Sequence, residues 1–96
     1  MAEGEPAEIP PEELLEAIRR MKVSDLLLST ISTTAQLGYA KLEGEARDLD
    51  QARLAIESIK ALLPVLEGEV GKEALTDFGR LLADLQLAYA KALEEE

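Results

Sequence analysis

The residue types most often used in enzyme chemistry are scarce in this chain. It has no histidine and no cysteine, so the commonest general base, the commonest zinc ligand and the thiolate nucleophile are all missing. The clearest cluster of possible metal ligands is Glu67, Glu69, Glu73 and Asp77, around Gly68 and Gly71. Hard cations favour several converging oxygens, but this spacing matches no calcium-loop pattern. The cluster predicts a solvated acidic turn, and we assign no metal and no cofactor.

Nucleophilic catalysis by serine has as little support. Ser24, Ser29 and Ser32 have no histidine to activate them, so helix capping and backbone hydrogen bonding are their expected roles. The chain has no glycine-rich phosphate loop, nucleotide fingerprint or basic-aromatic patch. We therefore expect an interaction or regulatory module without catalysis. The alternative is an accessory subunit, or a carboxylate-based enzyme that binds a cation at residues 67–77.

Composition predicts an all-α protein. The chain has 96 residues, of which 47% are hydrophobic and 3% aromatic, and Leu, Ala and Glu favour helix because they lose little rotamer freedom there. The net charge of −10 opposes binding to nucleic acid or to anionic membranes. The opening run "MAEGEPAEIPPEELL" lacks the basic and apolar regions of a secretion signal, so we expect a cytoplasmic protein.

The N-terminal part of the chain divides into a tail and a short helix. Residues 1–10 are rich in Glu, Gly and Pro, which predicts a disordered acidic tail. Residues 11–93 are expected to form a single helical domain, with its first helix beginning at Pro11. This helix has one apolar side, formed by Leu14, Leu15, Ile18 and Met21. The sequence leaves open whether residues 11–22 form a separate helix or continue into the next one.

Three longer helices should follow and pack as a small antiparallel bundle. The first runs from Val23 to about residue 42, with Gly44 as its stop. Asp48 and Gln51 resemble a capping box, after which apolar residues recur at spacings of three and four up to Leu66. Pro64 should end or bend this helix. The last helix should begin near Lys72 and fray at residues 94–96, where three acids oppose the helix dipole.

The stretch "LLLSTISTTAQLGYA", residues 26–40, carries no charge. As a helix it would span only about 22 Å, which is less than the ~30 Å hydrocarbon core of a bilayer. Packing in the protein's own core explains one side of the helix but not the other. We predict that this second side is the interface of a homodimer. Its candidate residues are Leu26, Ser29, Thr30, Thr33, Gln36, Leu37 and Ala40.

Three alternatives to the homodimer remain open. The uncharged side could be an exposed polar surface, or it could be a groove that binds another protein. Residues 11–28 could also lie on a membrane as a peripheral helix, although the net charge of the chain opposes this.

Several of these features together resemble a known family. They are the uncharged Ser/Thr-rich helix ending at Leu37 and Gly38, the capped helix with Ile56 and Glu57, and the final helix with Asp84. Over roughly residues 23–92 the chain resembles the bacterial domain of unknown function family number 1844, whose members are small all-helical proteins. The resemblance implies a helical fold and no particular activity.

Overall fold

The computed structural model describes residues 11–96, so the predicted tail at residues 1–10 lies outside the described part of the chain. The described part is all-α, as the composition predicts. Its four helices are α1 (Pro11–Arg20), α2 (Val23–Ala40), α3 (Leu49–Val65) and α4 (Lys72–Glu94), with a 3₁₀ turn at Gly44–Ala46 between α2 and α3. None of these helices is both long and apolar enough to cross a membrane.

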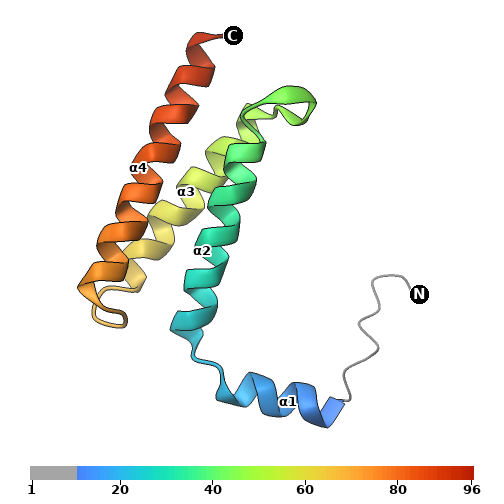
Figure 1. Ribbon diagram of the computed structural model, residues 1–96, viewed down its shortest axis with the longest axis vertical. Helices are drawn as coiled ribbons and strands as arrows, with labels where there is room; N and C mark the ends of the chain where they lie inside the picture. Colours follow the sequence, from blue (N-terminus) through green and yellow to red (C-terminus); the bar gives the residue numbers. More distant parts are fainter. Residues whose placement is uncertain (1–10) are drawn as a thin grey trace.

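Helices α2, α3 and α4 pack together, whereas α1 extends away from them (Figure 1). α2 and α4 run in the same direction, and α3 runs in the opposite direction (Figure 1). We call the end of the bundle where α2 and α4 begin and α3 ends the foot. The predicted arrangement of three main helices and a short N-terminal helix is therefore confirmed.

The core lies where the apolar seams of the three helices meet. The predicted spacing of three and four is confirmed, because the seam residues are buried or half-buried. Four large side chains are almost completely buried: Ile31 from α2, Ile59 from α3, Leu66 at the end of α3 and Leu85 from α4. Small residues complete the core and let the helices approach closely, and the buried ones are Ala35, Gly38, Ala52, Ala55 and Ala92.

The predicted limits of α3 are confirmed at both ends. The carboxylate of Asp48 accepts a hydrogen bond of 3.2 Å from the backbone N–H of Gln51, which satisfies one of the free donors of the first turn. The helix ends at Val65, one residue after Pro64. Proline has no N–H to donate to the carbonyl four residues back, so it weakens the last turn. Leu66 then turns inward, and Gly68 adopts a positive φ of 85° in the connection to α4.

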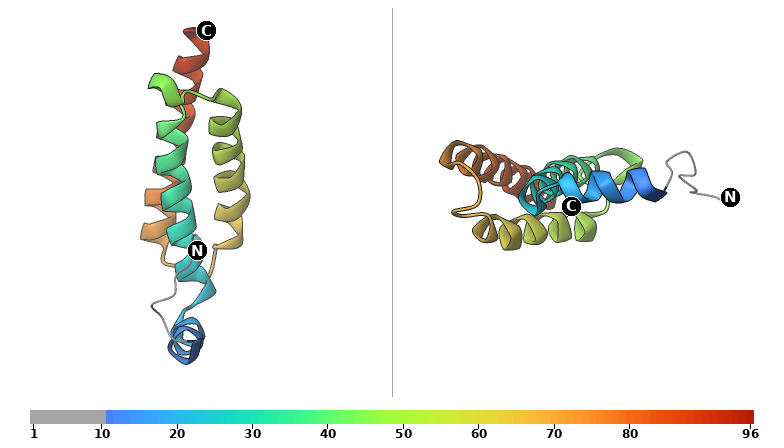
Figure 2. Two further views of the ribbon diagram at one scale, coloured as in Figure 1. Left: turned by 90° about the vertical axis from the view of Figure 1, so that its right-hand side faces the viewer. Right: turned by 90° about the horizontal axis from the view of Figure 1, so that it is seen from below.

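The structure settles whether the first helix continues into the second. α1 ends at Arg20, and Lys22 has an extended backbone with φ −92° and ψ 141°. The backbone N–H of Met21 donates to the carbonyl of Ile18, which closes the last turn of α1. Residues 21–22 are thus a two-residue break, and α1 leaves the foot of α2 on the side away from α4 (Figure 2).

Candidate interaction surface

All seven residues of the predicted interface are exposed. They lie on the side of α2 opposite Ile31, Ala35 and Gly38, which face the core. We call this set the free face of α2: Leu26, Ser29, Thr30, Thr33, Gln36, Leu37 and Ala40. α3 and α4 pack against the other side of α2, so no helix of the described chain covers the free face (Figures 1 and 2). The structure thus places the predicted residues on one surface, and their contact with a second copy stays a prediction.

Two leucines give the free face its apolar character. Leu26 and Leu37 are 51% and 56% exposed, although leucine is among the residues most often buried. Leu37 and Leu54 of α3 line the same hollow, whose other lining residues are Thr34, Lys41, Gln51, Ala55 and Ser58. Leu54 is 55% exposed and extends the free face onto α3. The sequence analysis missed Leu54, although its position outside the three-four spacing of α3 was a signal that it does not face the core.

A second apolar surface lies at the foot of the bundle. A groove of about 460 Å³ is lined by side chains from the start of α2, the end of α3 and the following turn: Lys22, Val23, Ser24, Leu27, Val65, Leu66 and Glu69. Val23 and Val65 are mostly exposed there. The groove adjoins the break between α1 and α2, so an occupant would contact the residues that join the two helices.

The third apolar surface is α1 itself. All ten of its residues are exposed, and no helix of the described chain packs along it (Figure 1). The apolar side predicted from the sequence therefore has no partner within residues 11–96. The four large side chains of this apolar side are between 43% and 53% exposed: Leu14, Leu15 and Ile18 from α1, and Met21 directly after it. The sequence analysis recognised this apolar side but did not include it in the predicted interface.

The acidic side chains and the tyrosine Tyr39 were the remaining candidates for chemistry. Within residues 11–96, no three carboxylates are placed to hold a metal ion, so the acids at 67, 69, 73 and 77 do not converge. Tyr39 is the one residue of the described chain whose pKa clearly departs from its ordinary value. Partial burial against α4, and secondly the negative charge of Asp84, raise the pKa of the Tyr39 phenol. A raised pKa makes the phenolate rarer at neutral pH, which disfavours a role as a nucleophile.

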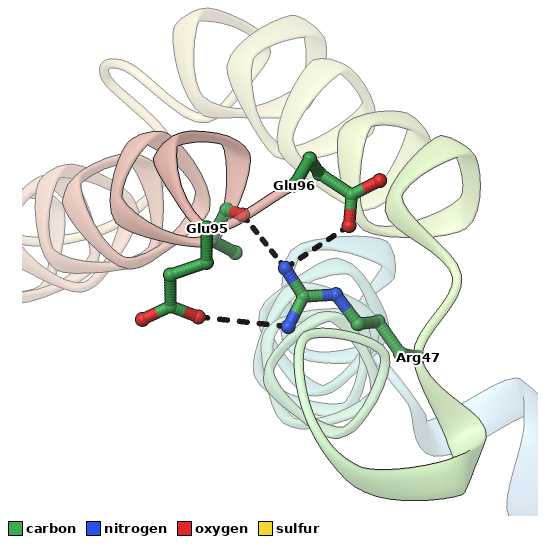
Figure 3. Close-up of polar contacts among 4 residues, drawn as sticks. Arg47, Glu95 and Glu96 are labelled. Carbon is green, nitrogen blue, oxygen red and sulfur yellow. Dashed lines mark hydrogen bonds and ion pairs between the residues drawn. The ribbon is translucent and has the colours of Figure 1, made fainter.

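The most extensive polar contact lies at the opposite end from the foot. Arg47, after the 3₁₀ turn, donates a hydrogen bond of 2.6 Å to the carbonyl oxygen of Ala92 (Figure 3). Its guanidinium also lies 3.6 Å from a carboxylate oxygen of Glu95 and 3.2 Å from one of Glu96. Glu94 is the last residue of α4, and the next two carboxylates lie beside Arg47. The fraying expected for residues 94–96 stays a prediction. The cation offsets the repulsion between these acids and the helix dipole.

Comparisons of the chain with protein-family models, with curated proteins and with solved structures find no match. The resemblance to the bacterial family number 1844 therefore stays a prediction from the sequence. The surfaces that the described helices leave uncovered are the features that bear on function.

Proposed function

We propose that this protein is a homodimeric interaction or regulatory module without catalysis, and that its subunits meet through the free face of α2. One observation carries the proposal: seven uncharged side chains form an exposed band along α2 that no other described helix covers. An apolar or uncharged band of this kind on a strongly charged protein is typical of a contact surface.

The net charge of the chain restricts where two copies can meet. Two molecules that each carry a net charge of −10 repel each other, and the repulsion increases as their charged surfaces approach. The free face carries no ionisable group, so two copies that meet there place no like charges directly opposite each other. Its Ser and Thr hydroxyls can bond to carbonyls of the preceding turn when water is excluded. A two-fold axis would place the same face on both subunits.

The proposed contact can be tested by placing a charge within it. Thr33 lies near the middle of the free face, and Thr33→Lys would force an ammonium group into the interface of both subunits at a cost of several kcal/mol. Thr76→Lys is the matched control, since Thr76 is also an exposed helical threonine, but on α4. Arg53→Glu on α3 is a second control, because Arg53 is exposed and lies outside the free face.

Sedimentation equilibrium of the wild type and the three variants across a concentration series gives the answer. We expect a dimeric wild type, a monomeric Thr33→Lys variant, and dimers for Thr76→Lys and Arg53→Glu. A wild type that stays monomeric at high concentration would contradict the proposal. So would a Thr33→Lys variant that keeps both the mass and the melting temperature of the wild type.

A further inference from the structure

α1 is a helix without a packing partner within residues 11–96. Its side chains are all exposed, and the helices that pack together within residues 11–96 are α2 with α3, α3 with α4, and α2 with α4. A helix of ten residues is marginal in water by itself and normally depends on packing of its apolar side. The apolar side of α1 is therefore available to an occupant, which a second molecule can supply.

The charges of α1 are divided between its two ends. Its acids are Glu12, Glu13 and Glu16, and its bases are Arg19 and Arg20. Lys22, which caps α2, adds a third base just after the helix. Within the helix only Glu16 pairs, at 3.5 Å from Arg19 and 3.6 Å from Arg20, and these pairs are well exposed. In the described chain Glu12, Glu13 and Lys22 have no ion partner within 4.0 Å. Exposed pairs of this kind contribute little, so all six charges remain available to a partner.

This division of charge makes α1 complementary to a second α1 that runs antiparallel to it. A parallel pair would bring acids beside acids and bases beside bases. An antiparallel pair centred between Ala17 and Ile18 brings the acidic first half of each helix alongside the basic end of the other copy. The same register places Leu14 beside Met21, so the apolar sides coincide. Two-fold symmetry makes each of these contacts twice.

We propose that α1 pairs antiparallel with α1 of a second copy of this chain and forms the second part of the dimer contact. The inference rests on the proposed homodimer, because a pair of ten-residue helices is too small an interface to hold two subunits alone. The geometry fits a shared contact. α1 leaves the foot of α2 on the side away from α4 (Figure 2). The free face lies on the side of α2 that is turned away from the core, so neither surface is covered by the bundle.

A membrane surface suits α1 less well than a second copy does. Helices that lie on membranes carry basic residues on their polar face, whereas α1 has acids along its first half. The rest of the chain is acidic, which opposes approach to anionic lipid. A second α1 that runs antiparallel places a basic half beside the acidic half of α1, so opposite charges lie near each other.

Two charge variants of α1 test the pairing. In the acidic variant, Arg19, Arg20 and Lys22 are replaced with Glu; in the basic variant, Glu12, Glu13 and Glu16 are replaced with Lys. Each variant alone should dimerise at least tenfold more weakly than the wild type, because like charges would face each other along the whole pair. An equimolar mixture should form heterodimers at least as tightly as the wild type. Both variants keep a net negative charge, so attraction between whole molecules does not produce this result.

Sedimentation velocity and native mass spectrometry of the wild type, each variant and the mixture separate the outcomes. Variants that dimerise as the wild type does would overturn the α1 pairing while leaving the homodimer intact. The α1 pairing would also be overturned if the mixture dimerised no more tightly than each variant alone. The weaker dimerisation of the variants would then reflect general charge repulsion. A monomeric wild type would overturn the proposed function as well. Folding of each variant is checked by its helix content and by the cooperativity of its thermal unfolding, since α1 does not pack along the bundle.

The direction of the pair has its own measurement, because the chain has no cysteine. Leu14→Cys and Met21→Cys variants are mixed and then oxidised. The antiparallel pair predicts a disulfide between the two variants and little between identical copies. A parallel pair would give the reverse result and would contradict the inference.

Discussion

Gly38 of α2 lies so close to Ala55 of α3 that a β-carbon at position 38 would stand 3.0 Å from the β-carbon of Ala55 and 3.2 Å from a methyl group of Leu85. The Ala55 methyl is attached directly to the α3 backbone, so it can move away only if the helix moves. The absence of a side chain at position 38 therefore sets the distance between α2 and α3.

We expect Gly38→Ala to destabilise the protein even though alanine favours helix. The gain in helix propensity is about 1 kcal/mol, whereas overpacking of a core costs about 1–3 kcal/mol. Gly79→Ala is the matched control, because Gly79 also lies within a helix and has open space around it. That variant should stabilise by up to about 1 kcal/mol. Urea denaturation measures both changes, and equal stabilisation by the two substitutions would contradict the close approach of the helices.

The contact between Arg47 and Ala92 ties the α2–α3 connection to the last turns of α4. Replacing Arg47 with Met retains most of the aliphatic stem but removes the guanidinium, which should lower the free energy of unfolding by about 1–2 kcal/mol. The combined variant Glu95→Gln and Glu96→Gln keeps the hydrogen bond to Ala92 and removes only exposed ion pairs. We expect it to cost less than ~1 kcal/mol. If the two variants lost equal stability in urea denaturation, the ion pairs rather than the carbonyl contact would fix the end of α4.

Gly68 should tolerate asparagine better than alanine. Its φ of 85° is a left-handed conformation, and no other group lies within 4 Å of where a β-carbon would be. Substitution there therefore meets backbone strain without a steric clash. Gly68→Ala should cost about 1–2 kcal/mol, and Gly68→Asn should cost less because asparagine visits this region more readily. Thermal unfolding of both variants gives the order, and an asparagine variant less stable than the alanine variant would be inconsistent with the observed turn.

The raised pKa of Tyr39 predicts a loss of stability at alkaline pH. Unfolded Tyr39 releases its proton near pH ~10, whereas the folded protein retains it to a higher pH. Above pH ~10 the unfolded state therefore binds fewer protons than the folded state, so the free energy of unfolding falls as the pH rises. Below that pH, Tyr39 does not change the free energy of unfolding with pH. Tyr39→Phe should remove this part of the decline in pH-dependent urea denaturation.

The phenol itself can be followed by its absorbance. In a Tyr89→Phe variant Tyr39 is the remaining tyrosine. Its midpoint should lie above the ordinary value, and adding Asp84→Asn should lower it only in part, because partial burial is the larger cause of the shift. A midpoint at or below the ordinary value would show that Tyr39 is fully hydrated.

The helices could be predicted from the sequence because their limits depend on neighbouring residues. The Asp48 side chain caps the third residue after it, and Pro64 weakens its own turn, so both act within a few positions of the chain. The seven residues of the free face were also found from local pattern, since an uncharged stretch is visible in the sequence. Their exposure is observed, and the partner proposed for them stays a prediction.

Contacts that depend on how helices are placed in space could not be predicted in the same way. Arg47 and Ala92 are 45 positions apart, and their contact depends on the length of α4 and on the path of the α2–α3 connection. The approach of Gly38 to Ala55 depends on the crossing of two helices. The direction in which α1 leaves the bundle follows from the backbone of residues 21–22, where no turn residue such as Gly or Pro marks the break.

Because α1 shares no packed surface with the bundle, it has no part in the bundle's cooperative unfolding. In a single subunit the amide protons of α1 should exchange with solvent nearly as fast as those of a free peptide. The amides of Ile31, Ile59 and Leu85 should exchange only when the whole bundle opens. Whatever covers α1 would slow exchange in that helix without changing the most protected amides of the core. The exchange rate of the α1 amide protons therefore reports whether another surface covers this helix.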